Sequence, residues 1–210
     1  MSPQEKRKKE KESKRNNILK AARKLFFDKG FKAVTVDSIA AKAGVSKGSI
    51  YLYFDSKEEI YAQVLIADNI EHHKDLLYLS SKEAPAEELL REYSERYVNN
   101  FLHDNELFRI LMTFMLQTEQ MNLTPQQNAE LIRTTNDNIK FVSGILQKGI
   151  DAGDFLPTID VRQTQNAIWG MLNGIISLFL FMGNPAKRAD RINTMVKESL
   201  DIFIKGLKNR

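Results

Sequence analysis

Apolar residues recur along most of this chain at the three- and four-residue spacing of amphipathic helices, and no useful length of strand-like alternation appears. The five prolines and ten glycines stand mostly where helices should end. We therefore expect an all-α fold. The pattern predicts nine helices, over residues 13–29, 36–43, 47–54, 57–80, 85–103, 105–120, 125–152 and 161–182, and from the break at 183–185 to 207.

The lengths of these helices divide the chain into two modules. Residues 1–57 hold three short helices behind a basic N-terminal arm, and residues 58–210 hold a larger body of six helices. The boundary lies inside a continuous helix rather than in a flexible linker. A helix of that kind is expected to link the two modules.

Residues 36–55, VDSIAAKAGVSKGSIYLYFD, have the pattern of a helix-turn-helix. Ala40 has to be small because the second helix crosses the first at close range. Gly44 suits the turn, since a residue without a Cβ adopts positive φ at no steric cost. The apolar residues expected to hold the pair together are Val36, Ile39, Val45 and Ile50.

The distribution of charge points to a polyanionic partner for the first module. Residues 1–57 carry fifteen Lys and Arg against six Asp and Glu, whereas residues 58–210 carry sixteen against twenty-one. A cationic segment on an anionic body is typical of a module that binds nucleic acid. Residues 1–15 predict either a solvated, disordered tail or an arm that contacts DNA, and both interpretations stay open.

Several other classes of function are disfavoured by the sequence. No apolar segment follows the N-terminal charges as in a secretory signal, and the run over residues 169–182 is too short and too polar to span a bilayer. The chain has no cysteine and three histidines, of which His72 and His73 are adjacent and project about 100° apart on a helix. We expect no enzymatic activity, no metal site, no cofactor and no membrane partner.

Residues 35–59, TVDSIAAKAGVSKGSIYLYFDSKEE, closely resemble the N-terminal domain of the TetR family of bacterial transcriptional regulators. The length, the helix count and the apolar C-terminal helices also fit that family. The absence of cysteine fits a reducing cytoplasm. The resemblance implies a homodimer whose two recognition helices enter successive major grooves of a palindromic operator. It also implies a small-molecule pocket in the body that controls DNA affinity, and most often repression.

The family pattern assigns DNA contacts to residues of this chain. Thr35 and Ser46 lie at helix N-termini that suit phosphate oxygens, although both would cap helices without DNA as well. Leu52 stands where many relatives carry tyrosine or histidine, so base preference is expected to differ at that point. The residues predicted to bind DNA are Thr35, Ser46, Lys47, Gly48, Ser49, Tyr51, Tyr53 and Lys57.

Two C-terminal helices carry the broadest apolar surfaces of the chain. The helix at 161–182 is apolar around most of its circumference, so it must be covered on nearly all sides. Pairing of these two helices with their symmetry mates is one interpretation, and packing within one chain is the other. The residues predicted at the dimer interface are Gly170, Gly174, Ile192, Met195, Val196, Leu200 and Phe203.

Aromatic and methionine residues of the body predict a hydrophobic effector, although each one alone is more typical of a core. The residues predicted to line this pocket are Tyr93, Tyr97, Phe101, Phe108, Met112, Phe141, Trp169 and Asn173. The leading hypothesis is thus a regulator that releases its operator when a small hydrophobic ligand binds. The alternative is a helical interaction or membrane-surface protein that uses its basic N-terminal segment.

Overall fold

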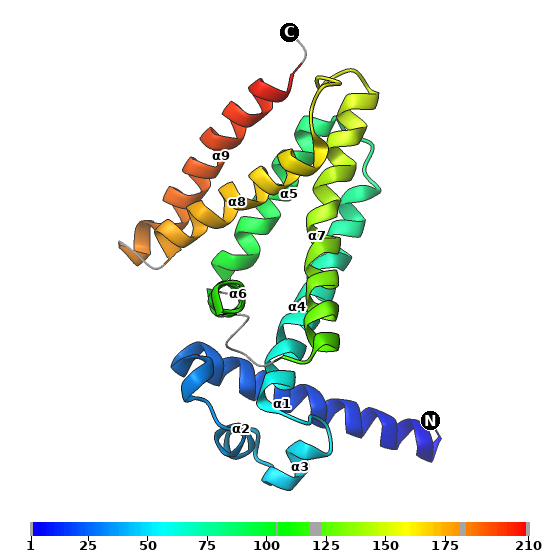
Figure 1. Cartoon of the computed structure of the whole chain (residues 1–210), viewed down its shortest axis with the longest axis vertical. Helices are drawn as coiled ribbons and strands as arrows, with labels where there is room; N and C mark the ends of the chain where they lie inside the picture. Colours follow the sequence, from blue (N-terminus) through cyan, green and yellow to red (C-terminus); the bar gives the residue numbers. More distant parts are fainter. Residues whose placement is uncertain (1, 104, 118–122, 181–183, 209–210) are drawn as a thin grey trace. The chain divides into compact units, whose positions relative to one another are not determined.

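The structure, a computed structural model shown in Figure 1, describes residues 2–103, 105–117, 123–180 and 184–208. In this part of the chain the regular structure is helical, apart from one antiparallel bridge between Phe155 and Lys208, and the predicted all-α fold is confirmed. The predicted helix ends at residues 120 and 182 lie outside the described residues. The elements are α1 (Pro3–Ala33), α2 (Val36–Ala43), α3 (Lys47–Tyr51), α4 (Lys57–Ser80), α5 (Ala86–His103), α6 (Asn105–Gln117), α7 (Pro125–Asp151), α8 (Val161–Leu180), the 3-10 helix η2 (Pro185–Lys187) and α9 (Arg188–Leu207).

The chain divides into two compact units. The first unit comprises Met1–Asp68 and Glu106–Arg133, and the second comprises Asn69–Asn105 and Thr134–Arg210. The chain therefore passes between the units inside α4, at the first residue of α6 and inside α7. The division at residue 57 made from the sequence stays a prediction of where the DNA-binding domain ends.

Helix α1 begins ten residues before its predicted start. Ser2 caps it, because the Ser2 side chain accepts a hydrogen bond from the Glu5 backbone N–H while the Glu5 carboxylate accepts one of 2.6 Å from the Ser2 backbone. Residues 3–15, for which the sequence leaves a disordered tail open, are thus helical. The helical conformation breaks at Gly30, whose φ of 75° is the left-handed geometry that suits glycine.

The predicted helix-turn-helix is present as α2 and α3. Thr35 and Ser46 cap the two helices, and Gly44 ends α2 in the left-handed conformation with φ of 68°. Ile39 and Ile50 are fully buried, while Val36 and Val45 are half-buried. Helix α3 ends at Tyr51 instead of the predicted residue 54, because the chain turns after Leu52.

An aromatic cluster forms the core beneath the helix-turn-helix. The rings of Phe26 and Phe31 from α1 both meet the edge of Tyr61 from α4, at centroid distances of 4.9 and 5.1 Å. The Tyr61 hydroxyl donates a 2.6 Å hydrogen bond to the backbone carbonyl of Ile110 in α6. Burial raises the pKa of Tyr61, so the hydroxyl remains a donor at physiological pH. This cluster joins α1, α4 and α6 within the first unit.

The second unit packs α5 against α8 and α9. A close contact joins α7 to the loop that follows it: a Cβ added to Gly149 would overlap the Phe155 ring and lie 2.9 Å from the Ala86 Cβ. Glycine is therefore required at position 149 by this close approach. Phe155 is buried over the glycine, and its backbone N–H donates to the Gly149 carbonyl at 3.0 Å.

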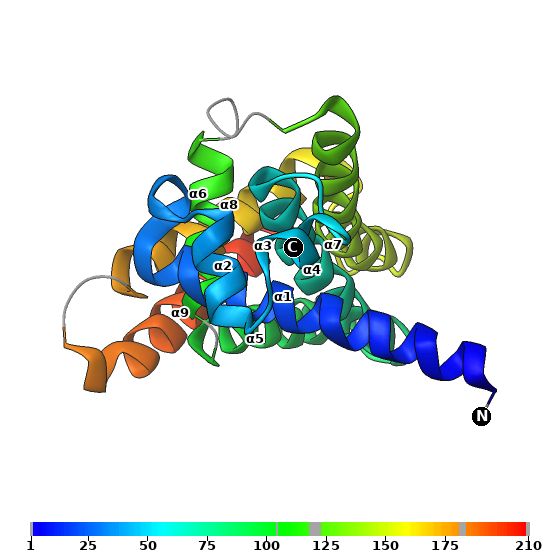
Figure 2. The same cartoon turned by 90° about the horizontal axis from the view of Figure 1, so that it is seen from below.

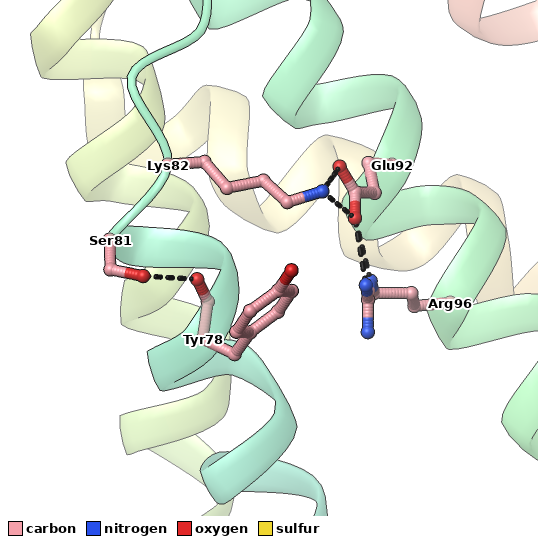
Figure 3. A network of polar contacts seen from close by, with 5 residues as sticks. All are labelled: Tyr78, Ser81, Lys82, Glu92 and Arg96. Carbon is pink, nitrogen blue, oxygen red and sulfur yellow. Dashed lines mark hydrogen bonds and ion pairs between the residues drawn. The ribbon is translucent and has the colours of Figure 1, made fainter.

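Ion pairs link α5 to the chain before it and to α9. Figure 3 shows Lys82, after α4, with its ammonium group 2.6 Å from both carboxylate oxygens of Glu92, which also accepts a hydrogen bond of 2.8 Å from Arg96. These bonds from Lys82 and Arg96 hold the pKa of Glu92 below its ordinary value. On α5, Arg91 bonds Asp201 of α9. The network stabilises the arrangement of helices and contains no residue assigned to a site.

Candidate functional site

The outer surface of α2 and α3 presents most of the residues predicted to bind DNA. Thr35, Ser46, Lys47 and Gly48 are exposed, and the exposed fraction of Tyr51 is 49%. Ser49 and Tyr53 are half-buried. Leu52, which departs from the family pattern, is 74% exposed beside them, whereas Phe54 is buried in the core. The structure thus brings these predicted residues together around one short exposed helix.

Gly48 is not required by the fold. Its backbone lies outside the positive-φ region, and an added Cβ would meet its nearest neighbour, the Ser46 side chain, only at 3.9 Å. Alanine also forms helices about 1 kcal/mol more readily than glycine. An external surface that approaches the backbone closely would account for a glycine here.

Lys47 is paired on the same surface with a residue that sequence reasoning missed. Its Nζ lies 2.8 Å from Oδ2 of Asp37 in the first turn of α2. The pKa of Lys47 is raised, first by this hydrogen bond and then by the charge of Asp37. Both side chains are more than half exposed, so the pair is screened by solvent and can be exchanged for a phosphate contact.

Lys57 is held differently from the other predicted residues. Its Nζ donates a 2.9 Å hydrogen bond to the backbone carbonyl of Phe31 and lies 4.3 Å from the centroid of the Phe31 ring. The half-buried ammonium group thus satisfies a backbone carbonyl in the last turn of α1, just after the break at Gly30. Sequence reasoning could not find this contact, because it joins residues 26 positions apart in the chain.

The second unit groups six of the residues predicted to line an effector pocket. The Tyr97 hydroxyl donates a 2.9 Å hydrogen bond to Oδ1 of Asn173, and the Asn173 amide donates to the backbone carbonyl of Trp169 at 2.8 Å. The ring of Tyr97 lies 6.0 Å from Tyr93 and 5.0 Å from Phe101. The Phe141 ring stacks with Tyr93 at a centroid distance of 6.0 Å. We call these six residues the aromatic cluster of the second unit.

The cluster is a largely apolar environment, whose polar groups include the Tyr97–Asn173 pair and the Tyr93 hydroxyl. Tyr93, Tyr97, Phe101 and Asn173 are each less than 7% exposed. Burial raises the pKa of both Tyr93 and Tyr97, so their hydroxyls stay neutral at physiological pH. The other two predicted residues belong to α6 in the first unit, where Phe108 is fully buried and Met112 is half-buried.

The residues predicted at a dimer interface fall into two groups. Ile192, Val196 and Leu200 are no more than 5% exposed in the single chain, because α9 packs this stripe against α5 and α8. These three residues are thus covered within their own chain, and their place at a dimer interface stays a prediction. The remaining residues are accessible to a partner: Gly170 and Gly174 are exposed, Met195 is 38% exposed and Phe203 is half-buried.

Within the described ranges there is neither a metal-binding cluster nor a helix that could span a membrane. No group of three His, Asp or Glu side chains among these residues is placed to hold a metal ion. No helix in this part of the chain is long and apolar enough to cross a membrane.

The exposed α3, its capped partner helix and the cationic segment that carries them define a DNA-binding helix-turn-helix protein. The family model for bacterial regulatory proteins of the tetR family matches residues 18–64. The model for the tetracyclin repressor-like C-terminal domain matches residues 83–179. The HTH-type transcriptional repressor KstR2 of Mycolicibacterium smegmatis is 30% identical over 71% of each chain. This chain belongs to the TetR family of transcriptional regulators.

Other relatives match over nearly the whole chain. The fatty acid metabolism regulator protein of Bacillus subtilis is 27% identical, over 96% of this chain and all of its own length. The fold is also that of the fatty acid degradation regulator FadR from Bacillus halodurans, with a TM-score of 0.76, 20% identity and coverage of 94% and 97% of the two chains. The Bacillus subtilis regulator FadR in complex with stearoyl-CoA has a TM-score of 0.75 at 21% identity, over 91% and 98%.

Proposed function

We propose that this regulator is a homodimeric repressor that releases a palindromic operator when an acyl thioester binds in its second unit. The observation that carries the DNA-binding half is the set of exposed polar residues around α3. The observation that supports the effector half is the aromatic cluster of the second unit, whose buried surface is apolar except for the Tyr97–Asn173 pair and the Tyr93 hydroxyl.

In the complex with DNA, α3 would lie in the major groove with its N-terminal turn nearest the bases. Lys47 and Ser49 would contact base edges or the backbone, and the rings and hydroxyls of Tyr51 and Tyr53 would contact thymine methyls or phosphates. The exposed caps Thr35 and Ser46 belong to helix N-termini, which suit phosphate oxygens. Gly48 would allow the helix backbone to approach the groove.

The dimer would use the exposed faces of α8 and α9. On α8, Gly170, Gly174 and Leu178 follow one another at four-residue spacing and are all exposed, which leaves a thin surface for close helix approach. On α9, Met195 and Ile202 stand seven residues apart and are 38% and 72% exposed. Exposed apolar surface of this extent supports an isologous interface, and two-fold symmetry matches a palindromic operator.

The effector would act through the chain segments that run between the units. An acyl chain that enters the aromatic cluster has to displace rings that contact one another, and Tyr93 and Tyr97 belong to α5 while Phe141 belongs to α7. Helix α7 continues into the first unit, and α5 leads directly to α6. A ligand that binds the DNA-free form more tightly would therefore lower operator affinity. The name of the Bacillus subtilis relative, a fatty acid metabolism regulator, and the stearoyl-CoA in a structure of the same fold support an acyl ligand.

The proposal is tested by selecting the DNA that the full-length protein binds from genomic fragments and then adding candidate effectors. We expect the selected fragments to share an inverted repeat. We also expect stearoyl-CoA, but not CoA alone, to release a fluorescent duplex of that repeat in an anisotropy titration. If the selected DNA lacked an inverted repeat, the proposal of a palindromic operator would be contradicted. If stearoyl-CoA and CoA released the duplex equally, the proposal of a hydrophobic effector would be contradicted.

A further inference from the structure

The N-terminal part of α1 carries a concentration of positive charge that the family match does not include. Residues 3–15 hold seven Lys and Arg against three Glu, and the matched region begins at residue 18. These residues are helical and, except for the half-buried Arg15, exposed. Figures 1 and 2 both show these turns of α1 projecting past α2 and α3 within the first unit.

The positive charges do not surround this helix evenly. Arg7, Lys11 and Lys14 follow one another at spacings of four and three residues, so they share one face. Ile18 and Leu25, which lie eleven and eighteen residues after Arg7, continue the same face and are buried against the rest of the unit. The basic stripe of Arg7, Lys11 and Lys14 therefore continues, toward the N-terminus, the face by which α1 packs in its own unit, where α2 is one of its neighbours.

Arg15, at the base of the projecting turns, contacts α4 and a residue that follows the recognition helix. The Arg15 guanidinium donates a 2.5 Å hydrogen bond to Oε1 of Gln63 in α4. The same group lies 5.2 Å from the centroid of the Phe54 ring, which is buried three residues after α3 ends. Because α1 is helical without interruption from Pro3 to Gly30, the orientation of the stripe is set by the packing of the helix-turn-helix.

We propose that the basic stripe binds phosphates of the duplex that flank the groove occupied by α3. This inference rests on the DNA-binding half of the proposed function, and it names the residues of the arm that would contact DNA, a possibility that the sequence left open. Arg7 and Lys14 are separated by about 10 Å along the helix axis at 1.5 Å per residue. Duplex DNA carries one charge for about every 1.7 Å of its axis, so a stripe of this length can meet several phosphates. A helix that lies in a membrane surface buries an apolar face, and the stripe contains no apolar residue that could form one.

The test compares two variants of the full chain that lose the same charge from opposite faces of α1. The stripe variant is Arg7→Ala, Lys11→Ala and Lys14→Ala. The matched control is Lys6→Ala, Lys9→Ala and Lys20→Ala, three exposed lysines on the far side of the helix. Alanine favours the helix, and circular dichroism of both variants checks that helicity is unchanged.

Affinity for a 40-base-pair duplex of random sequence is measured by anisotropy between 50 and 200 mM KCl. In the stripe variant we expect the slope of log affinity against log salt to become shallower by about 2.7 for each bound chain, which is about 0.9 for every phosphate that the chain no longer neutralises. The control should keep the wild-type slope. Equal slopes for the two variants would overturn the proposal, as would an effect of the stripe variant confined to binding of anionic vesicles of phosphatidylserine and phosphatidylcholine.

The two proposals fail in different ways. The stripe variant should still prefer the selected operator over random DNA, because phosphate contacts carry no base readout. If the wild-type protein showed no such preference, the proposed operator binding would be contradicted. The test of the stripe would still hold, because the salt slopes of the two variants are measured on random DNA.

Discussion

The buried hydroxyl of Tyr97 donates a 2.9 Å hydrogen bond to the side-chain oxygen of Asn173, which joins α5 to α8 in the middle of an aromatic cluster. A polar pair in such surroundings is stable only while both partners are satisfied. An effector that enters the cluster has to keep this bond or replace it. The pair is therefore both a structural element of the second unit and the polar contact point of the proposed site.

Removing one partner of this pair should destabilise the protein more than removing both. Tyr97→Phe leaves a buried oxygen without its donor, and we expect the free energy of unfolding to fall by about 1–3 kcal/mol. The double variant Tyr97→Phe with Asn173→Leu should recover part of that loss. Urea unfolding followed by circular dichroism measures both, with the exposed Tyr78→Phe as the control. A double variant that is no more stable than Tyr97→Phe alone would contradict a coupled pair.

Two glycines of the helix-turn-helix should respond oppositely to alanine. Gly44 has φ of 68°, so Gly44→Ala should lower the free energy of unfolding by about 1 kcal/mol. Gly48→Ala has room for its methyl group and should leave stability equal or higher, yet weaken binding to the selected operator. Thermal unfolding and anisotropy on the same samples distinguish the effects. If Gly48→Ala bound the operator as tightly as wild type, the close approach of the α3 backbone to DNA would be contradicted.

The ion pair on the recognition surface predicts a gain of function. Asp37→Asn removes a negative charge beside the expected phosphates and releases Lys47, so we expect tighter binding to both operator and random duplexes. Stability should change little, because the pair is exposed. Anisotropy titrations at 100 mM KCl measure the affinity. Weaker binding by Asp37→Asn would show instead that Asp37 holds Lys47 in its binding position.

The close contact between α7 and the following loop predicts a stability defect in the second unit. Gly149→Ala would place a methyl group into the Phe155 ring, and we expect a loss of about 1–3 kcal/mol in the free energy of unfolding. Phe155→Leu in the same chain should relieve part of it. Gly206→Ala, in α9 with nothing within 4 Å of the added Cβ, is the matched control. An unfolding midpoint equal to that of wild type would contradict the contact.

Much of the first unit could be predicted from sequence because its signals are local. The caps Thr35 and Ser46, the small Ala40 and the turn at Gly44 each act through neighbours within a few residues, and all four stand as expected. The first turns of α1 could not be predicted with the rest of that helix, because charged residues give no apolar periodicity. Their capping box, Ser2 with Glu5, is the local signal that could have located the start.

Contacts between distant segments could not be read in this way. The stripe of Ile192, Val196 and Leu200 indicates a buried helix face, but periodicity does not say whether the chain itself or a second copy covers it. In the structure α5 and α8 cover it. The bond from Lys57 to the Phe31 carbonyl likewise depends on how α1 and α4 meet, which no local pattern encodes.

The exposed surface of α3 is tested most directly by alanine substitution of two of its predicted contact residues. Lys47→Ala and Tyr53→Ala should each weaken binding to the selected operator by about tenfold or more with helicity unchanged. Lys197→Ala, at an exposed position of α9, should bind as wild type does. If both α3 variants kept wild-type affinity in the same anisotropy titration, the assignment of this helix to the DNA interface would be contradicted.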